Sequence, residues 1–186
     1  MASAATAQKL SPGIAHDPEF DAAFYAPYEA AAQAAFEMLC AARRKHGGDV
    51  QAIQFRLKSP ASIRGKLRKK GMPETAQAAG TCLHDVAGLR AVLGSKRAVY
   101  RFAETLMTGG VARLDAVHDY IAAPKESGYR SLHLIFSVPV VLHAQAYLVP
   151  VEIQLRTAAM DAWACMEHRL IYKPRPVAPA SIPGGV

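Results

Sequence analysis

Two carboxylates stand in mainly apolar, strand-like stretches of the sequence, Asp85 in HDVAGLR and Glu152 in VPVEIQLR. A carboxylate without a partner is costly in such surroundings, because burial removes its hydration. If two strands place both groups on one face, they can hold a hard divalent cation between the protein and a phosphate. Alternatively, each pairs with a neighbouring arginine as an ion pair at the edge of a sheet. The spacing leaves both interpretations open.

A cationic segment precedes these carboxylates; its basic residues are Arg56, Lys58, Lys66, Arg68, Lys69 and Lys70. Arg56 and Lys58 are two positions apart on a predicted strand, so they share a face. Lys66, Lys69 and Lys70 are spaced by three and four along a predicted helix, so they also share a face. Like charges gathered in this way repel one another, and a bound polyanion such as a triphosphate would reverse that repulsion. A solvated basic face is the alternative.

A third group of candidates lies in the motif ESGYRSLH. Gly128 permits an unusual backbone angle, Tyr129 can stack on a base, and Arg130 and His133 can reach phosphate or ribose. A loop tyrosine can equally be packed against the fold. The wider stretch from position 120 to 173 interleaves strand-like runs with further groups suited to a nucleotide and a metal, namely Lys125, Glu152, Gln154 and Arg156.

The composition restricts the class of protein. A chain of 186 residues that is 51% hydrophobic can build one domain with a sizeable core, and a net charge of +7 favours anionic partners. Three widely spaced cysteines without a CxxC motif predict reduced thiols in a cytoplasmic protein. The sequence contains no stretch long and apolar enough for a bilayer, so no membrane partner is predicted. The motifs GxxxxGK[ST], GxGxxG and HExxH are absent, which argues against P-loop, Rossmann and zinc hydrolase classes.

The elements that would position these residues follow from hydrophobic periodicity. Helices are predicted over 17–46 with a break at Pro27, from residue 60 to 71, over 95–109 and over 157–172. Strands are predicted over 53–59, 83–94, 111–121, 131–142 and 146–156, the last two forming a hairpin, while 73–81 lacks a pattern. We expect one α+β domain over residues 17–173, with a mixed, mostly antiparallel sheet of about five strands flanked by helices. Residues 1–16 would form a flexible leader and residues 174–186 a proline-rich tail.

Four blocks of the chain, in continuous order, carry a specific resemblance: FRLKSPASIRGKLRKKG, HDVAGLRAVLGS, HDYIAAPKESGYRSLHLIF and VEIQLRTAAMDAWACMEHRLIYK. Together they resemble the small alarmone synthetases of the RelA/SpoT-homologue group, whose synthetase domain is nucleotidyltransferase-like. Members transfer a pyrophosphate unit from ATP to the 3′-hydroxyl of GDP or GTP. The products are AMP and the stringent-response alarmones, and the reaction uses Mg²⁺. ATP and GDP or GTP are therefore the expected partners.

The resemblance also implies roles for individual residues. Those that would grip the ATP phosphates are Arg56, Lys58, Lys66 and Lys69. Asp85 and Glu152 would bind Mg²⁺, and Glu152 would also act as general base on the 3′-hydroxyl. Those that would line the acceptor pocket are Tyr129, Arg130, His133, Gln154, Glu167 and His168. From the residues alone, Glu167 and His168 can equally be ordinary surface groups of the last helix.

The chain departs from the family pattern in three ways. His118 stands where relatives commonly carry a basic residue, and Asp161 where some have asparagine. Relatives continue with helices that build a tetramer, whereas this sequence ends thirteen residues after position 173, so the resemblance leaves the oligomeric state open.

Two alternative functions accompany the expected one. One alternative is a toxin-type relative that modifies adenine nucleotides or the 3′ end of tRNA. The other is a non-catalytic nucleotide- or RNA-binding module.

Overall fold

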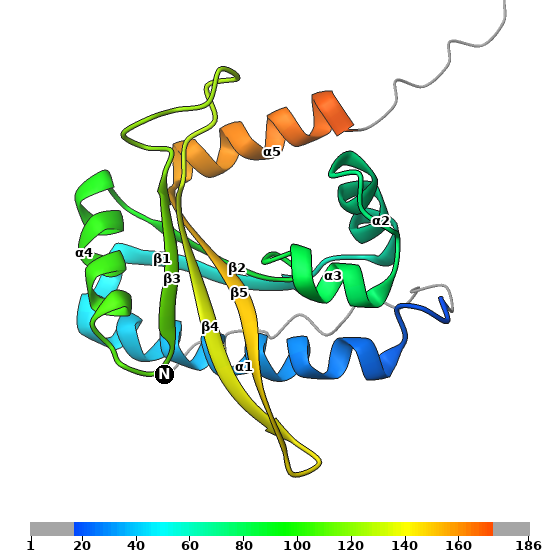
Figure 1. The fold of residues 1–186 in the computed structure, drawn as a ribbon. Coiled ribbons are helices and arrows are strands. Elements are labelled where there is room, and N and C mark those ends of the chain that lie inside the picture. Colours follow the sequence, from blue (N-terminus) through cyan, green and yellow to red (C-terminus); the bar gives the residue numbers. More distant parts are fainter. Residues whose placement is uncertain (1–16, 173–186) are drawn as a thin grey trace, which may run out of the picture.

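The computed structural model of the protein describes residues 17–172; the expected leader and tail lie outside the described residues. In chain order the elements are α1 (Ala22–His46), the short 3₁₀ helix η1 (Gly47–Asp49), β1 (Val50–Leu57), α2 (Pro60–Lys69), α3 (Ala76–Cys82), β2 (Ala87–Leu93), α4 (Lys96–Met107), β3 (Arg113–Asp119), β4 (Leu132–Leu142), β5 (Gln145–Thr157) and α5 (Ala158–Tyr172). The strands form one five-stranded sheet in the order β1-β2-β5-β4-β3 (Figure 1). β2 pairs with β5 in parallel, and the other neighbours are antiparallel. The mixed α+β sheet confirms the predicted fold class.

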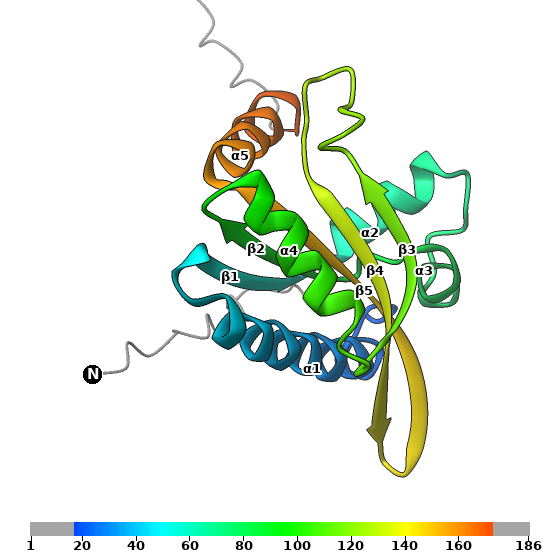
Figure 2. The ribbon, with the colours of Figure 1, turned by 90° about the vertical axis from the view of Figure 1, so that its left-hand side faces the viewer.

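Alternation of side chains along the strands separates the two faces of the sheet. In β2 the odd-numbered positions, including Leu89 and Ala91, are buried, and in β5 Ile153 and Leu155 are completely buried. These side chains belong to one hydrophobic core together with residues of α1 and α4, the two helices that cover this face (Figure 2). The opposite face carries the intervening, mostly polar positions and is bordered by α2 and α5. Within the described residues no helix has the length and apolar character needed to cross a bilayer.

Two features of the helices differ from the prediction. Most of α3 falls within the run 73–81. The helix begins after Thr75, whose hydroxyl accepts a hydrogen bond from the backbone N–H of Ala78. Seven residues are too few for a helical period to show in the sequence, and the N-cap was the available signal. The predicted break at Pro27 is wrong, because α1 continues through it. Pro27 lies early in the helix, where it removes one hydrogen bond, and the buried Tyr25 and Tyr28 on either side anchor that turn.

The cysteines conform to the prediction of free thiols: Cys40 and Cys82 are partly buried and Cys165 is exposed. The predicted hairpin between the last two long strands is also present, but its loop is shorter than expected. Only His143 and Ala144 connect β4 to β5, with φ of 50° and 63°. Two consecutive left-handed residues are what a tight turn between twisted strands requires, and neither of them is a glycine.

We expect Ala144→Gly to raise the free energy of unfolding by about 0.5–1 kcal/mol, because a glycine adopts the left-handed angle without steric cost. Urea denaturation followed by circular dichroism measures this change. The control is Ala41→Gly within α1, where the same substitution should cost about 1 kcal/mol. Destabilisation by Ala144→Gly would contradict the turn geometry.

Candidate active site

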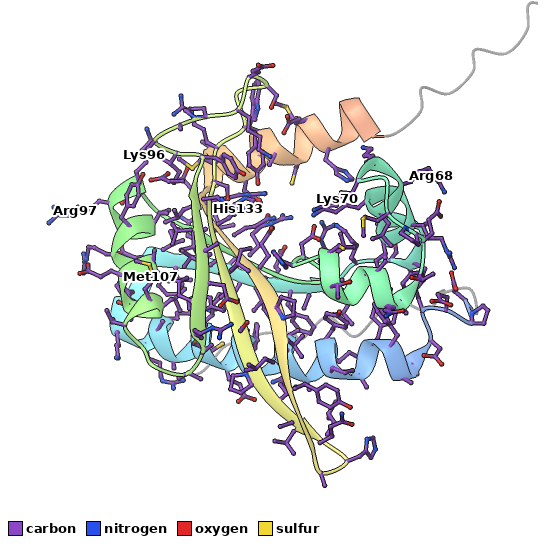
Figure 3. The ribbon with its side chains drawn as sticks, viewed as in Figure 1. Arg68, Lys70, Lys96, Arg97, Met107 and His133 are labelled. Atoms are coloured by element: carbon purple, nitrogen blue, oxygen red, sulfur yellow. The ribbon has the colours of Figure 1, made fainter. Side chains whose placement is uncertain are left out.

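The polar face of the sheet forms the floor of a cleft of about 790 Å³. Its walls come from α2 on one side, α5 above, and the segment that follows β3 on the other side. In Figure 3, His133 lies on the sheet and Lys70 lies beside α2, across the space beneath α5. The cleft therefore collects residues from segments that are far apart in the sequence.

The register of the paired strands arranges the residues of the cleft floor in two rows. Both rows run across the strands, on the same face of the sheet. The first row consists of Arg56, Gly88, Glu152 and Ile135. The second row consists of Gln54, Arg90, Gln154, His133 and His118. Because Gly88 has no side chain, a small cavity of about 80 Å³ remains between Arg56, Asp85, Arg90 and Glu152. The two predicted carboxylates thus border the same space.

Asp85 lies just before β2, not within the strand predicted over 83–94, and is held by two lysines. Nζ of Lys58 and Nζ of Lys66 lie 2.8 and 2.7 Å from the same oxygen, Oδ2. The other oxygen, Oδ1, is buried and has no hydrogen-bond partner. Burial raises the pKa of Asp85, but the two lysine contacts outweigh it, so the net pKa lies below the usual value. The group is therefore an ionised carboxylate, one oxygen of which has no hydrogen-bond partner.

Glu152 belongs to a closed ring of five polar side chains, which we call the polar ring: Glu152, Gln154, Arg156, Tyr129 and His133. The amide nitrogen of Gln154 donates to Oε1 of Glu152, and its carbonyl oxygen accepts from Nη2 of Arg156 at 2.6 Å. Nη2 of Arg156 also donates to the Tyr129 hydroxyl at 2.6 Å, which in turn lies 2.8 Å from Nε2 of His133. Nδ1 of His133 lies 3.6 Å from Oε2 of Glu152 and closes the ring.

Burial and the contacts of the polar ring shift the pKa of two of its members, Glu152 and Tyr129. Burial raises the pKa of Glu152, but the contacts from His133 and Gln154 outweigh both burial and the negative charge of Asp85. The pKa of Glu152 therefore lies below its usual value, and the group is an ionised carboxylate at neutral pH. Burial raises the pKa of Tyr129, which keeps the phenol protonated.

Most of the predicted site residues line the cleft: Arg56, Lys66, Asp85, Tyr129, His133, Glu152, Gln154, Glu167 and His168. Three of the predicted residues do not. Lys58 contacts Asp85 rather than the open space, and Lys69, the last residue of α2, is exposed. Arg130 is exposed and donates to the backbone carbonyl of Ile121 at 3.1 Å. Lys58 also lies one residue beyond the end of β1 rather than within a strand.

The ring of Tyr129, predicted to stack on a base, is already bordered by cations. Nζ of Lys125 lies 4.9 Å from its centroid and 4.6 Å from that of Tyr120. Cζ of Arg156 lies 5.2 Å from the centroid of Tyr129. The same loop packs on α5, where a side chain at Gly128 would meet the ring of Trp163 at 3.4 Å. The aromatic surface of the cleft is therefore tied to cationic groups suited to phosphate.

Three residues that line the cleft were missed in the sequence: His84, Arg90 and Tyr120. Lys70 and Arg156, which also line the cleft, were named there only as members of larger polar sets. The alternation in AGLRAVL was a usable signal for Arg90, because it places this residue on the same face as Gly88. No sequence signal connects Arg90 to its partner, Asp161, whose Oδ1 lies 3.1 Å from Nη1 of Arg90. His118 and Tyr120 lie stacked at the far side of the cleft, 6.1 Å apart between ring centroids.

Comparison with protein families assigns the chain. The model described as the region found in RelA / SpoT proteins matches residues 55–176, more than half of the chain. The chain belongs to the RelA/SpoT family. The cleft residues from Arg56 to His168 fall within this RelA/SpoT region, whereas Gln54 of the floor and α1, which covers the back of the sheet, precede it.

Two curated relatives from Bacillus subtilis are similar to this chain. The GTP pyrophosphokinase YwaC is 40% identical over 129 residues, covering 69% of this chain and 61% of that protein. The GTP pyrophosphokinase YjbM is 38% identical over 128 residues, covering 67% of this chain and 57% of that protein. The chain thus spans about three fifths of the length of these RelA/SpoT relatives.

Solved structures agree with the RelA/SpoT assignment. The crystal structure of small alarmone synthetase 1 from Bacillus subtilis, bound to its product pppGpp, is similar with a TM-score of 0.75 at 34% identity. That similarity covers 82% of this chain and 81% of the other. A GTP pyrophosphokinase family protein from Streptococcus pneumoniae gives a TM-score of 0.75 at 30% identity, covering 81% of this chain and 75% of the other.

Arg156→Lys should lower the free energy of unfolding by about 2 kcal/mol, because the single ammonium group of a lysine cannot replace the hydrogen bonds of the planar guanidinium group. Arg156 is only 4% exposed and donates to Ser131, Asp161, Tyr129 and Gln154. Denaturant unfolding at neutral pH measures the loss.

The matched control is Arg113→Lys, at an arginine whose side chain is 70% exposed and pairs with Asp115. We expect that change to cost less than about 0.5 kcal/mol, because exposed ion pairs contribute little. Equal effects of the two substitutions would show that the polar ring does not stabilise the protein.

Proposed function

We propose that this chain is a pyrophosphokinase that transfers the β,γ-pyrophosphate of ATP to the 3′-hydroxyl of GDP or GTP, releasing AMP and a (p)ppGpp alarmone. The observation that carries the proposal is the meeting of Asp85 and Glu152 at one cavity, with lysines and arginines on one side and the polar ring on the other. The names of the similar proteins, GTP pyrophosphokinases and an alarmone synthetase with its product, support the same reaction.

The charge of the cleft suits two polyphosphates. Its lysines and arginines are Arg56, Lys66, Lys70, Arg90, Lys125 and Arg156, whereas its carboxylates are Asp85, Glu152 and Glu167. An excess of cations in a concave site concentrates anionic ligands. We assign the ATP phosphates to the α2 side, because Lys66 and Lys70 line the cleft there and Arg56 borders the small cavity. Lys58 acts there through Asp85.

The residues around the small cavity fit Mg²⁺. Asp85 has a buried oxygen without a partner, and Glu152 borders the same cavity. Among the described residues no group of three or more His, Cys, Asp or Glu side chains could hold a metal. A site with two carboxylates agrees with the usual binding of Mg²⁺ by one or two carboxylates together with substrate phosphates. Bound by Asp85 and Glu152, the ion would neutralise charge that develops on the phosphate oxygens.

Glu152 is the group suited to remove the proton from the 3′-hydroxyl. It is ionised because its pKa is lowered, and His133 and Gln154 hold its two oxygens in place. As the proton passes to Glu152, the 3′-oxygen forms a bond to the β-phosphorus of ATP. The bond from that phosphorus to the oxygen of AMP breaks, and the pair of electrons leaves with AMP. The fixed cations of the cleft stabilise this charge without reorganising.

The acceptor occupies the side of the cleft formed by Tyr129, His133 and α5 in this proposal. An aromatic side chain that stacks on a base contributes about 1–3 kcal/mol. Stacking does not distinguish guanine from adenine, and the names of the similar proteins support the guanine nucleotide over an adenine nucleotide or tRNA. Retention of both carboxylates in one site supports an enzyme over a binding module.

Glu152→Gln should reduce pyrophosphate transfer by at least about 100-fold, because an amide cannot accept the proton. The assay follows label from γ-labelled ATP into GDP, GTP, ADP or tRNA, with the products separated by chromatography. Glu104→Gln, an exposed carboxylate on α4, is the control and should leave transfer unchanged. Wild-type turnover in Glu152→Gln would remove the proposed base, and label on ADP or tRNA alone would change the acceptor.

Lys66→Ala should raise the apparent KM for ATP about 10-fold and change the KM for GDP much less, because Lys66 lies on the side assigned to the donor phosphates. Steady-state kinetics with one nucleotide varied at a time measures both constants. Lys45→Ala, in the last turn of α1, removes an equal charge away from the cleft and should change neither. An unchanged ATP constant for Lys66→Ala would contradict the assignment of the two sides.

A further inference from the structure

One carboxylate joins the two arginines that stand on neighbouring strands of the cleft floor. Oδ1 of Asp161, in the first turn of α5, lies 3.0 Å from Nη1 of Arg156 on β5. The same oxygen lies 3.1 Å from Nη1 of Arg90 on β2. Asp161 is thus a bridge between β2, β5 and α5.

The bridge counteracts a repulsion. The side chains of Arg156 and Arg90 are 5% and 26% exposed, so the two positive charges are poorly screened by water. Nε of Arg90 is buried and has no hydrogen-bond partner, and among the described residues Asp161 is the partner in its ion pair. Without the carboxylate, both guanidinium groups would lose the contact that keeps them side by side.

The two arginines have their other contacts in different parts of the cleft. Arg90 borders the small cavity together with Arg56 and Asp85, on the side assigned to ATP. Arg156 donates to Gln154 and to Tyr129, which face the acceptor side. Gln154 in turn holds Glu152. A continuous chain of polar contacts therefore runs from the donor side through Asp161 to the proposed base.

We infer that Asp161 is a positioning residue that couples the two nucleotide sites: its hold on Arg90 and Arg156 makes occupation of the donor side favour the geometry that binds the acceptor. This inference rests on the proposed function. Coupling between ligands travels through such contiguous networks and typically changes affinity by 5- to 150-fold. A role limited to stabilising the fold would leave the affinity of one nucleotide independent of the other.

Calorimetric titration of GDP into the protein, with and without saturating α,β-methylene ATP and Mg²⁺, tests the inference, because the methylene group blocks the bond that breaks. We expect the analogue to tighten GDP binding about 10-fold in the wild type. In Asp161→Asn this factor should fall to less than about 2-fold. The affinity for each nucleotide alone should not weaken in this variant, because removing a negative charge beside two arginines favours anionic ligands.

Two further variants separate positioning from stability. Asp161→Glu keeps the carboxylate and should retain most of the coupling. Asp17→Asn removes a carboxylate that pairs with Arg64, 2.9 Å away and outside the cleft, and should leave the coupling unchanged. Unchanged coupling in Asp161→Asn, equal loss in Asp17→Asn, or no coupling in the wild type would each overturn the inference.

The transfer assay tests the proposed function, and the titrations test the role of Asp161, so the two proposals can fail independently. A wild-type protein that couples the two nucleotides but transfers no pyrophosphate would overturn the proposed function, and loss of that coupling in Asp161→Asn would still support Asp161 as the coupling residue. Transfer to GDP with coupling that survives Asp161→Asn would support the proposed function and overturn the role of Asp161.

Discussion

The parallel pairing of β2 with β5 is the constraint on which the cleft depends. It sets Gly88 beside Glu152 and Arg90 beside Gln154, although these positions are more than sixty residues apart in the chain. A slip of one residue in this register would turn Glu152 towards α1 and α4 and bring Ile153 to the polar face. The complete burial of Ile153 and Leu155 opposes such a slip. Hydrophobic burial on one face therefore maintains the positions of the charged groups on the other.

Charge pairing within the cleft follows from that register. Arg156, almost fully buried, has a hydrogen-bond acceptor on each of its nitrogens, as a buried guanidinium requires. Exceptions occur elsewhere: of the described residues, His46, Asp85 and Arg90 have a buried side-chain atom without a partner. Two of these three border the small cavity next to Gly88. Unsatisfied buried groups are expected where a ligand completes the structure, and their position agrees with a nucleotide site.

The sequence predicted side-chain chemistry and faces better than partners. Alternation along each strand sufficed to place Glu152 and Gln154 on a polar face, and the helical spacing brought Lys66 into the cleft. Pairing between distant segments was not predictable. The alternation of side chains along a strand determines which face a residue occupies, but not which residues of other segments it contacts. Asp161 illustrates this limit: as a lone acid in an amphipathic helix, it gave no indication of the two arginines that it joins. The short α3 was missed for a different reason, since seven residues make slightly less than two helical turns.

The two sides of the cleft differ in how far they are organised without ligands. The polar ring is closed by contacts among its own members, so the proposed base is held in place before an acceptor arrives. On the other side, Lys58 and Lys66 share a single oxygen of Asp85, and the Lys66 side chain is 39% exposed. In the proposed reaction, a triphosphate offers those lysines stronger partners and releases the carboxylate for Mg²⁺. The donor side is thus completed by its ligand, whereas the acceptor side is preorganised, and the bridge at Asp161 lies between them.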